Sequence, residues 1–428
     1  MKPIYVPEGK LDTNQRRVYD LRENASFIVQ GCAGSGKTSL AMLRMQQRLA
    51  KDRNSDTTKF YYIAYVRELV ECIRRDIRNC PQMHEIAQWD DFLITLENWN
   101  QKEISDWMRN KCHVTPRPGM REEYEAESGT RTYRRVAVRI NPRPEYLFVD
   151  ECQDLTMDDI RDLVGSAKEG IAFYGDDAQH IMHWQGRSPV LLEDIQRAFP
   201  ERFKEIHQLL FNYRLPKEIA SFAQELGGRR DLVDHCKSKY HEKPIVRCFT
   251  EQELSGDKKI EYMASRIANW DLQDVAIVLP YNEAVRDYYG TLSRQLGGGA
   301  VSASWEIRTR PGEPRREGVH YSYLRDTRVK IMTYEKVKGQ QFETVFLLVR
   351  GEMDAEDVER FYVGVTRAER FLYVLCAGSM PACLRSVPVD LYNTTDENIE
   401  PTGLYGHSEQ SDASNPDTPN SNTEGEDW

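Results

Sequence analysis

One short segment near the start of the chain constrains the fold more than any other feature. Residues Gly31–Thr38 read GCAGSGKT and fit the pattern GxxxxGK(S/T), in which glycines let backbone N–H groups surround phosphate oxygens. The segment follows the apolar run 27–30 and precedes an amphipathic stretch at 39–49. The pattern therefore predicts a strand, a phosphate-binding loop and a helix, the opening unit of a parallel α/β domain.

Short apolar runs recur through both halves of the 428-residue chain and alternate with amphipathic stretches. We expect strands at residues 27–30, 60–65, 146–149, 171–174, 275–279, 329–333, 345–349 and 371–375. Apolar runs of this length, each followed by a helix, are typical of parallel sheets covered on both faces. The chain is too long for one ordinary core, so we predict two domains. We place them at 1–207 and 208–388, with insertions at about 88–143 and, rich in arginine, about 297–328.

The acidic charge of the chain is concentrated at its C-terminal end. The formal net charge is −10, and the segment 394–428 holds Asp and Glu but neither Lys nor Arg. Aliphatic residues nearly vanish there, so the segment cannot bury enough apolar area to offset its ordering entropy. We therefore predict a disordered acidic tail over 389–428, which either keeps the chain in solution or docks on a protein partner.

The cysteines argue against a disulfide-bonded or zinc-binding protein, and the hydropathy argues against a membrane-spanning or secreted one. The nine cysteines form no CxxC pair, which argues against a disulfide framework or a zinc site and favours a reducing cytosol. No apolar run approaches the roughly 20 residues that span a bilayer, and the first residues lack the apolar stretch of a signal peptide. We expect a cytoplasmic protein without a membrane segment.

Two adjacent carboxylates follow a predicted strand. Asp150 and Glu151 come directly after the apolar run 146–149. Downstream of a phosphate-binding loop, Asp150 and Thr38 are the residues expected to hold Mg²⁺. Glu151 is then expected to orient and deprotonate the attacking water.

Two further side chains complete the expected phosphate chemistry. Lys37 would neutralise the β- and γ-phosphates of a bound nucleotide. Gln179 follows the predicted strand at 171–174 and would sense the γ-phosphate. The cofactors that these residues predict are a nucleoside triphosphate and Mg²⁺.

Taken in order, the motifs resemble those of the UvrD/Rep-like superfamily 1 DNA helicases over about residues 11–376. The matching segments are Leu11–Gln15, Gly31–Thr38, Asp150–Asp154, Gly175–Gly186, Asn212–Arg214, Thr333–Phe342 and Tyr362–Ala368. The resemblance implies an α/β fold in which two RecA-like parallel-sheet P-loop domains flank an ATP cleft, with small helical insertions. It also implies an ATP-dependent translocase or helicase that moves 3′-to-5′ on single-stranded DNA.

The nucleotide-binding positions of the family transfer to particular residues of this chain. By resemblance, Gln15 would read the adenine, Tyr213 would stack on it, and Gln341 would contact the ribose. Arg214 and Arg367, from the second domain, would reach the γ-phosphate. The full implied set is Gln15, Gly31, Gly34, Ser35, Gly36, Lys37, Thr38, Ser39, Tyr213, Arg214, Gln341 and Arg367. The implied catalytic residues are Lys37, Glu151, Gln179, Arg214 and Arg367.

The family also implies where nucleic acid is contacted. The expected residues are Tyr65, Arg67, Trp89, Trp184 and Thr333. Aromatic side chains at such positions stack on bases without regard to sequence, because every base has a π-face. For Trp184 the alternative is packing in the core. For Trp89 the sequence supports packing in the core and contact with nucleic acid equally. The motifs do not distinguish DNA from RNA as the track.

The sequence departs from the family pattern at several motif positions. Glu335 stands where the family has His, Gln341 where it has a ribose-binding Glu, and Gln185 where it usually has Arg. The accessory insertions are also short, and in the family such insertions assist strand separation. The alternative is therefore a compact motor that unwinds little alone and regulates a partner, such as a nuclease in a repair, phage or defence system. An unrelated P-loop kinase or nucleotide switch would require the order of the motifs to be accidental.

Overall fold

The computed structural model describes residues 6–51, 60–64, 69, 73, 93–95, 122–125, 131–134, 144–179, 190–227, 232–254, 257–307, 316–318 and 327–395. Backbone contacts divide the chain into a compact unit, Met1–Asp396, and a second unit, Glu397–Trp428, which lies outside the described residues. Four of the residues expected to contact nucleic acid also lie outside them, namely Tyr65, Arg67, Trp89 and Trp184.

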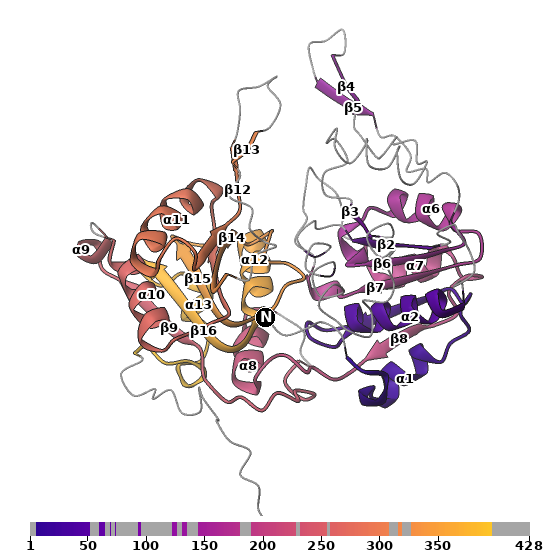
Figure 1. Ribbon diagram of the computed structural model, residues 1–428, viewed down its shortest axis with the longest axis horizontal. Helices are drawn as coiled ribbons and strands as arrows, with labels where there is room; N and C mark the ends of the chain where they lie inside the picture. Colours follow the sequence, from indigo (N-terminus) through magenta and orange to yellow (C-terminus); the bar gives the residue numbers. More distant parts are fainter. Residues whose placement is uncertain are drawn as a thin grey trace, which may run out of the picture. The chain divides into compact units, whose positions relative to one another are not determined.

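Six parallel strands form the first sheet, in the order β3-β2-β6-β7-β1-β8 (Figure 1). Their bounds are β1 Phe27–Gly31, β2 Phe60–Ala64, β3 Leu93–Thr95, β6 Tyr146–Asp150, β7 Gly170–Gly175 and β8 Ile206–Leu209. The helices are α1 Thr13–Tyr19, α2 Lys37–Lys51, α6 Met157–Ser166 and α7 Leu192–Ala198. Alternate strand residues face opposite sides, so one core packs against α1 and α2 and the other against α6 and α7.

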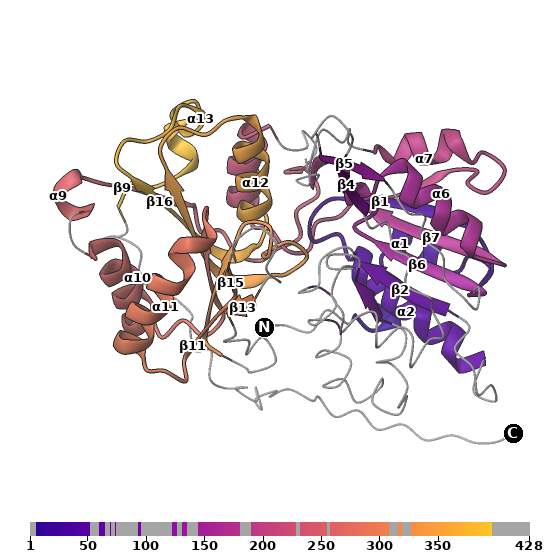
Figure 2. The ribbon, with the colours of Figure 1, turned by 90° about the horizontal axis from the view of Figure 1, so that it is seen from above.

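A second sheet of six parallel strands has the order β11-β14-β10-β15-β16-β9 (Figure 2). The strands are β9 Ile245–Phe249, β10 Val275–Leu279, β11 Val301–Ala303, β14 Val329–Thr333, β15 Phe342–Arg350 and β16 Ala368–Ala377. The helices are α8 Lys217–Glu225, α9 Glu251–Leu254, α10 Lys258–Asn269, α11 Asn282–Leu296, α12 Ala355–Val365 and α13 Ala382–Arg385. Two sheets of this kind agree with the α/β fold expected for RecA-like domains.

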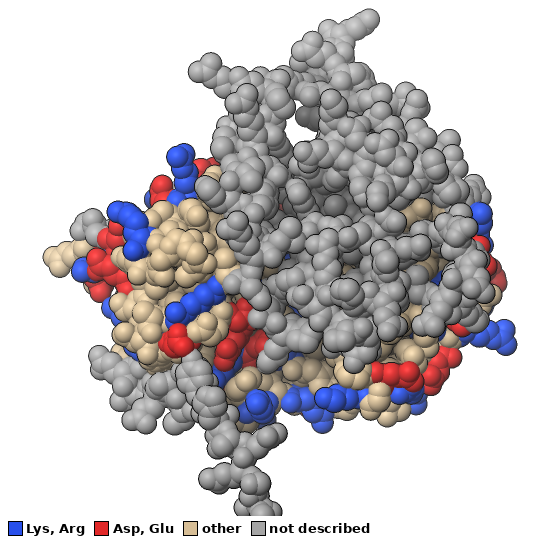
Figure 3. Space-filling view, in the orientation of Figure 1, with Lys and Arg blue, Asp and Glu red and all other residues tan. Residues whose placement is uncertain are grey.

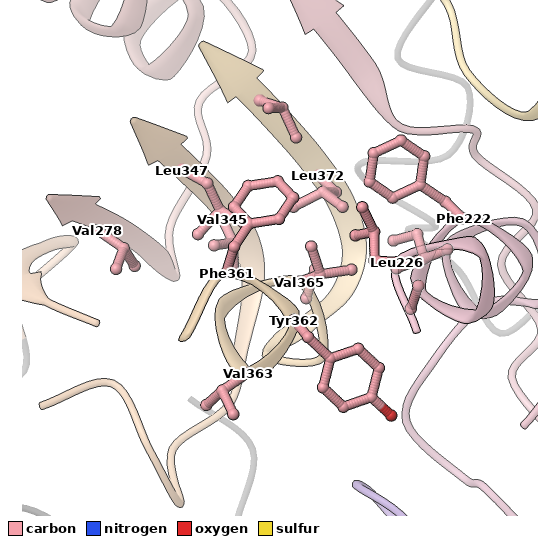
Figure 4. Packing of buried hydrophobic residues seen from close by; sticks show 14 of the residues in the cluster. Phe222, Leu226, Val278, Val345, Leu347, Phe361, Tyr362, Val363, Val365 and Leu372 are labelled. Atoms are coloured by element: carbon pink, nitrogen blue, oxygen red, sulfur yellow. The ribbon is translucent and has the colours of Figure 1, made fainter. Parts of the chain in front are cut away.

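The core of the second sheet fixes the position of α12, the helix that precedes Arg367. Phe361 and Val365 of α12 lie in one buried cluster with Val345 and Leu347 of β15 and Phe222 of α8 (Figure 4). These side chains are almost fully buried, which stabilises the helix by about 1.5–3 kcal/mol for each large apolar group. The C-terminal end of α12 is therefore held firmly against the sheet.

The described residues of both ranges that were predicted to be insertions contain strands and no helix. β3 and β11 extend the two main sheets, because their short apolar segments pair in parallel with β2 and β14. The others form two antiparallel hairpins, β4 Glu122–Glu125 with β5 Arg131–Arg134, and β12 Trp305–Ile307 with β13 Arg316–Gly318. The prediction of helical insertions is thus wrong for the residues described in these ranges.

Two predicted boundaries also change. β8 pairs with β1 through Leu209, so the first sheet continues past the domain boundary predicted at 207. The predicted tail at 389 begins too early, because Val389–Leu391 form a 3-10 helix and the Asn393 backbone bonds to Pro244 and Val246. Tyr392 is buried and packs edge-to-face on Phe222. No helix in the described part of the chain is long and apolar enough to cross a membrane.

Candidate functional site

The loop Gly31–Thr38 joins β1 to α2, and two of its glycines have positive φ angles. Gly34 has φ +78° and Gly36 has φ +86°, a region that residues with a Cβ rarely adopt. A Cβ on Gly34 would lie 2.4 Å from Cβ of Arg214, and one on Gly36 would lie 2.6 Å from Nε2 of Gln15. Glycine is therefore required both by the backbone angles and by the close approach of two other segments.

Two polar side chains of this loop, Lys37 and Ser35, are buried, and only Lys37 has hydrogen-bond partners among the described residues. The Nζ of Lys37 donates to the carbonyl oxygens of Gly31 at 2.7 Å and Cys32 at 3.1 Å. The buried Oγ of Ser35 has no hydrogen-bond partner among the described residues. An ammonium group and a free hydroxyl at the N-terminus of α2 fit an anionic oxygen ligand, since a helix N-terminus carries a partial positive charge.

Asp150 is the last residue of β6, and its carboxylate contacts the same loop through Thr38. Its Oδ2 accepts hydrogen bonds from Oγ1 of Thr38 at 2.7 Å and from the hydroxyl of Tyr62 at 2.6 Å. Burial, followed by the charge of Glu151, raises the pKa of Asp150. A hydroxyl and a carboxylate are oxygen ligands of the type that Mg²⁺ prefers. The structure thus brings together the two residues predicted to hold a metal.

Glu151 occupies an unusual backbone conformation directly after β6. Its φ is +51°, in the left-handed region that non-glycine residues seldom adopt. Its Oε2 accepts from Nε2 of Gln153 at 2.6 Å and lies 3.8 Å from Nζ of Lys338. Burial opposes ionisation, but the positive charges of Lys338, Lys37 and Arg367 outweigh it and lower the pKa of Glu151. The carboxylate is therefore ionised at neutral pH and able to accept a proton.

Gln179 and Arg367 meet directly. The Nη2 of Arg367 donates to Oε1 of Gln179, whose Nε2 donates to Asp176. The Nε of Arg367 donates to the carbonyl of Val363 at 2.9 Å, at the end of α12. Burial, and then the charge of Arg214, lowers the pKa of Arg367 to about 9, so the guanidinium remains charged at neutral pH.

The second arginine, Arg214, approaches the loop from the segment that follows β8. Its Nε donates to Oε1 of Gln341 at 3.3 Å and its Nη1 to the carbonyl of Thr366 at 3.3 Å. The backbone N–H of Tyr213 donates to the carbonyl of Gly34 at 3.0 Å. Two charged guanidinium groups therefore lie beside the loop and the carboxylates.

The residues expected to hold a nucleotide base also contact the loop. Gln15 donates from Nε2 to the carbonyl of Ser35 at 2.9 Å. Asp12 caps α1, accepting from the backbone of Gln15, and also accepts from the hydroxyl of Tyr213 at 2.7 Å. Tyr213 is 44% exposed, which leaves area free for a flat ligand. Thr333, in contrast, is buried at the end of β14, so its side chain offers little surface to nucleic acid.

Residues 329–375, from β14 into β16, match the family model of the UvrD-like helicase C-terminal domain. This stretch is UvrD-like. Over these residues, the resemblance to UvrD-like helicases that the motifs predicted is confirmed. Among solved structures, the C-terminal domain of a possible DNA helicase from Lactobacillus plantarum WCFS1 is 17% identical, with a TM-score of 0.30. The likeness covers 42% of this chain and 97% of that one, and at such a score we draw nothing from it. No curated protein matches the chain.

Three residues of the candidate site were given no role by the sequence. Tyr62 lies within a predicted strand, where an aromatic residue indicates only core packing, yet its hydroxyl binds Asp150. Asp154 and Lys338 belong to matched motifs, and the structure pairs them at 2.7 Å. Their motif membership was the available signal, but a linear sequence does not tell which motif residues meet.

Proposed function

We propose that this chain is an ATPase that translocates along single-stranded DNA with 3′-to-5′ polarity and can unwind duplexes. One observation supports the proposal above the others. Arg367 of the second sheet binds Gln179 of the first, beside Glu151 and the loop that holds Lys37. Arginine charge supplied from a second domain is how this class of enzyme stabilises a transferring phosphoryl group.

The residues of the loop would bind the nucleotide phosphates. Lys37 would exchange its loop carbonyls for phosphate oxygens, and the unpaired hydroxyl of Ser35 would donate to another. Thr38 and Asp150 would hold Mg²⁺, which when bound neutralises charge that develops between the phosphates. Glu151 would orient water and accept its proton. Gln15 and Tyr213 would hold the base, and the amide of Gln341 would face the sugar or keep Arg214 in place.

Hydrolysis would be coupled to movement through the two sheets. Arg214 and Arg367 stabilise the closed arrangement only while a charged γ-phosphate is present between them and the loop. Its release removes that partner and favours opening, so the two sheets grip the track alternately. The track residues proposed from the family are Tyr65, Arg67, Trp89 and Trp184, and Thr333 is left out because it is buried. On the face that Figure 3 shows, the Lys and Arg side chains of the described residues are interspersed with Asp and Glu.

The test is the ATPase rate of the full chain, measured with single-stranded DNA, duplex DNA and RNA at two salt concentrations. Stimulation by single strands that falls steeply with salt is expected, because each phosphate contact releases counterions. Lys37→Ala should lose at least about 100-fold in rate while retaining nucleic-acid binding. Lys258→Ala, an exposed lysine on α10, is the matched control and should behave as wild type.

Two outcomes contradict the proposal in different ways. An ATPase rate that ignores every nucleic acid would exclude a motor. Stimulated hydrolysis without strand displacement would instead favour the compact motor subunit that regulates a partner. Strand displacement with and without residues 394–428 then determines whether the acidic segment contributes to that role.

A further inference from the structure

The carboxylate of Asp12, at the start of α1, has two separate sets of partners. Its Oδ1 accepts from the backbone N–H groups of Asn14 at 2.7 Å and Gln15 at 2.9 Å, which caps the helix. Its Oδ2 accepts from the hydroxyl of Tyr213 at 2.7 Å, a residue 201 positions further along the chain. One oxygen is therefore enough for the cap, and the other holds a side chain of the segment that follows β8.

Tyr213 is fixed at two points while its ring stays accessible. Its backbone N–H donates to the carbonyl of Gly34 at 3.0 Å, and its hydroxyl is bound to Asp12. The ring of Phe211 lies beside it, with 6.2 Å between the ring centroids. Tyr213 nevertheless remains exposed. An aromatic ring that is held in place and open to solvent is prepared to stack on a flat ligand, because it loses little freedom when the ligand binds.

Asp12 also connects Tyr213 with Gln15. The backbone N–H of Asp12 donates to Oε1 of Gln15 at 3.1 Å, and Nε2 of the same amide donates to the carbonyl of Ser35 at 2.9 Å. In the described part of the chain, the hydrogen bonds of the Asp12 side chain go to α1 and Tyr213, and none goes to the phosphate-binding loop. Asp12 therefore links the two residues assigned to the base without contacting the groups assigned to the phosphates.

We propose that Asp12 is a positioning residue for the nucleotide base, whose Oδ2 fixes the ring of Tyr213 beside Gln15. This inference rests on the proposed ATPase function and names a residue that sets the affinity for the base of the nucleotide. The hydrogen bond to Tyr213 is present without a ligand, so it acts by ordering the ring beforehand. Its loss weakens the binding of a nucleotide and leaves the binding of a bare phosphate chain unchanged.

Two single variants remove this hydrogen bond from opposite sides. Asp12→Ser keeps a good helix cap, since serine and aspartate are about equally favoured at that position, but its shorter side chain lacks the second oxygen. Tyr213→Phe keeps the ring and removes only the hydroxyl, so it leaves the cap of α1 untouched. The double variant should bind ATP no more weakly than the weaker of the two single variants, because both changes remove the same interaction.

The measurements are KM for ATP and kcat of the full chain with single-stranded DNA, and the inhibition constant of inorganic tripolyphosphate, a probe without a base. KM should rise by about two- to tenfold in each single variant, which corresponds to the cost of ordering one side chain on binding. The effect on kcat should be smaller than the effect on KM. The inhibition constant of tripolyphosphate should stay at the wild-type value.

Tyr19→Phe is the matched control. The hydroxyl of Tyr19 donates to Oε2 of Glu8 at 3.0 Å, so this variant also removes a hydrogen bond between a tyrosine and a carboxylate, but away from the loop. Its KM for ATP should equal that of wild type. Asp12→Asn tests for rescue, because its Oδ1 still caps α1 and its Nδ2 can donate to the oxygen of Tyr213. It should recover most of the affinity that Asp12→Ser loses.

The outcomes separate the inference from the function on which it rests. An active wild type whose KM for ATP is unchanged in Asp12→Ser and in Tyr213→Phe overturns the inference and leaves the proposed function intact. Equal losses of affinity for ATP and tripolyphosphate also overturn it, because Asp12 would then support the loop and not the base. A wild type without any stimulated ATPase overturns both.

Discussion

A methyl group added at Gly34 tests the closest approach between the loop and the second arginine. Gly34→Ala places a Cβ at φ +78°, which costs about 1–2 kcal/mol for an L-residue. That Cβ would lie 2.4 Å from Cβ of Arg214 and 2.8 Å from Oδ1 of Asn212. The Cβ of Arg214 is fixed to the backbone, and Oδ1 of Asn212 is held by the backbone N–H groups of Arg214 and Leu215, so the backbone must shift, at about 1–3 kcal/mol. Together the two effects predict a loss of about 2–5 kcal/mol.

The assay is urea unfolding followed by circular dichroism, with Gly165→Ala as the matched control. Gly165 lies in α6, and a Cβ there would meet no atom within 4 Å. Alanine is favoured over glycine inside a helix, so this variant should gain about 0.5–1 kcal/mol. Replacing glycine with alanine is therefore expected to lower the unfolding free energy at Gly34 and to raise it at Gly165.

The ATPase rate gives a second measure of Gly34→Ala. Displacing Arg214 from the loop should lower kcat even under conditions where the variant is folded. If Gly34→Ala unfolds at the same urea concentration as wild type and hydrolyses ATP at the same rate, the contact between the loop and Arg214 does not exist in solution. The assignment of Arg214 to the site would then fail with it.

Three further changes test the carboxylates and the buried arginine. Tyr62→Phe removes a donor to the carboxylate of Asp150 and should lower the unfolding free energy in urea by about 1.5–3 kcal/mol. Burial, partly offset by Lys338, raises the pKa of Asp154 to about 6 from 3.8, so the folded state holds a proton that the unfolded state releases. The stability of wild type relative to Asp154→Asn should therefore fall by about 3 kcal/mol as pH rises from about 4 to about 6 in urea titrations. Arg367→Ala should lower kcat by about 1,000-fold or more with ATP binding retained in a fluorescent-nucleotide assay; equal losses in both would contradict its role.

The central strands of both sheets were predictable because they are buried on both faces. Runs such as Val275–Leu279 and Tyr146–Asp150 contain almost only apolar residues, and short runs of this composition are typical of strands inside a parallel sheet. The edge strand β8 was missed for the opposite reason. In β8 the sequence Ile206–Leu209 reads IHQL and is only partly buried, so backbone pairing with β1, rather than hydrophobicity, determines it.

The site was predictable as a set of residues but not as a set of contacts. The loop around Lys37 was predictable from its motif alone, because the glycines, the lysine and the following helix are contiguous in the sequence. The meeting of Arg367 with Gln179, in contrast, depends on how α12 packs on its sheet. The same holds for Lys338 and Asp154, which no local pattern could pair. The side chains that surround Glu151 are therefore determined by tertiary packing.

The left-handed backbone at Glu151 sets a limit on how far this chain can be stabilised by engineering. Glycine or asparagine would adopt φ +51° more readily, so substitution there should make the fold more robust. It would also remove the carboxylate to which the chemistry is assigned. A search for thermostable variants that scores folding alone should therefore select against the residue at the centre of the site, and activity must be screened alongside.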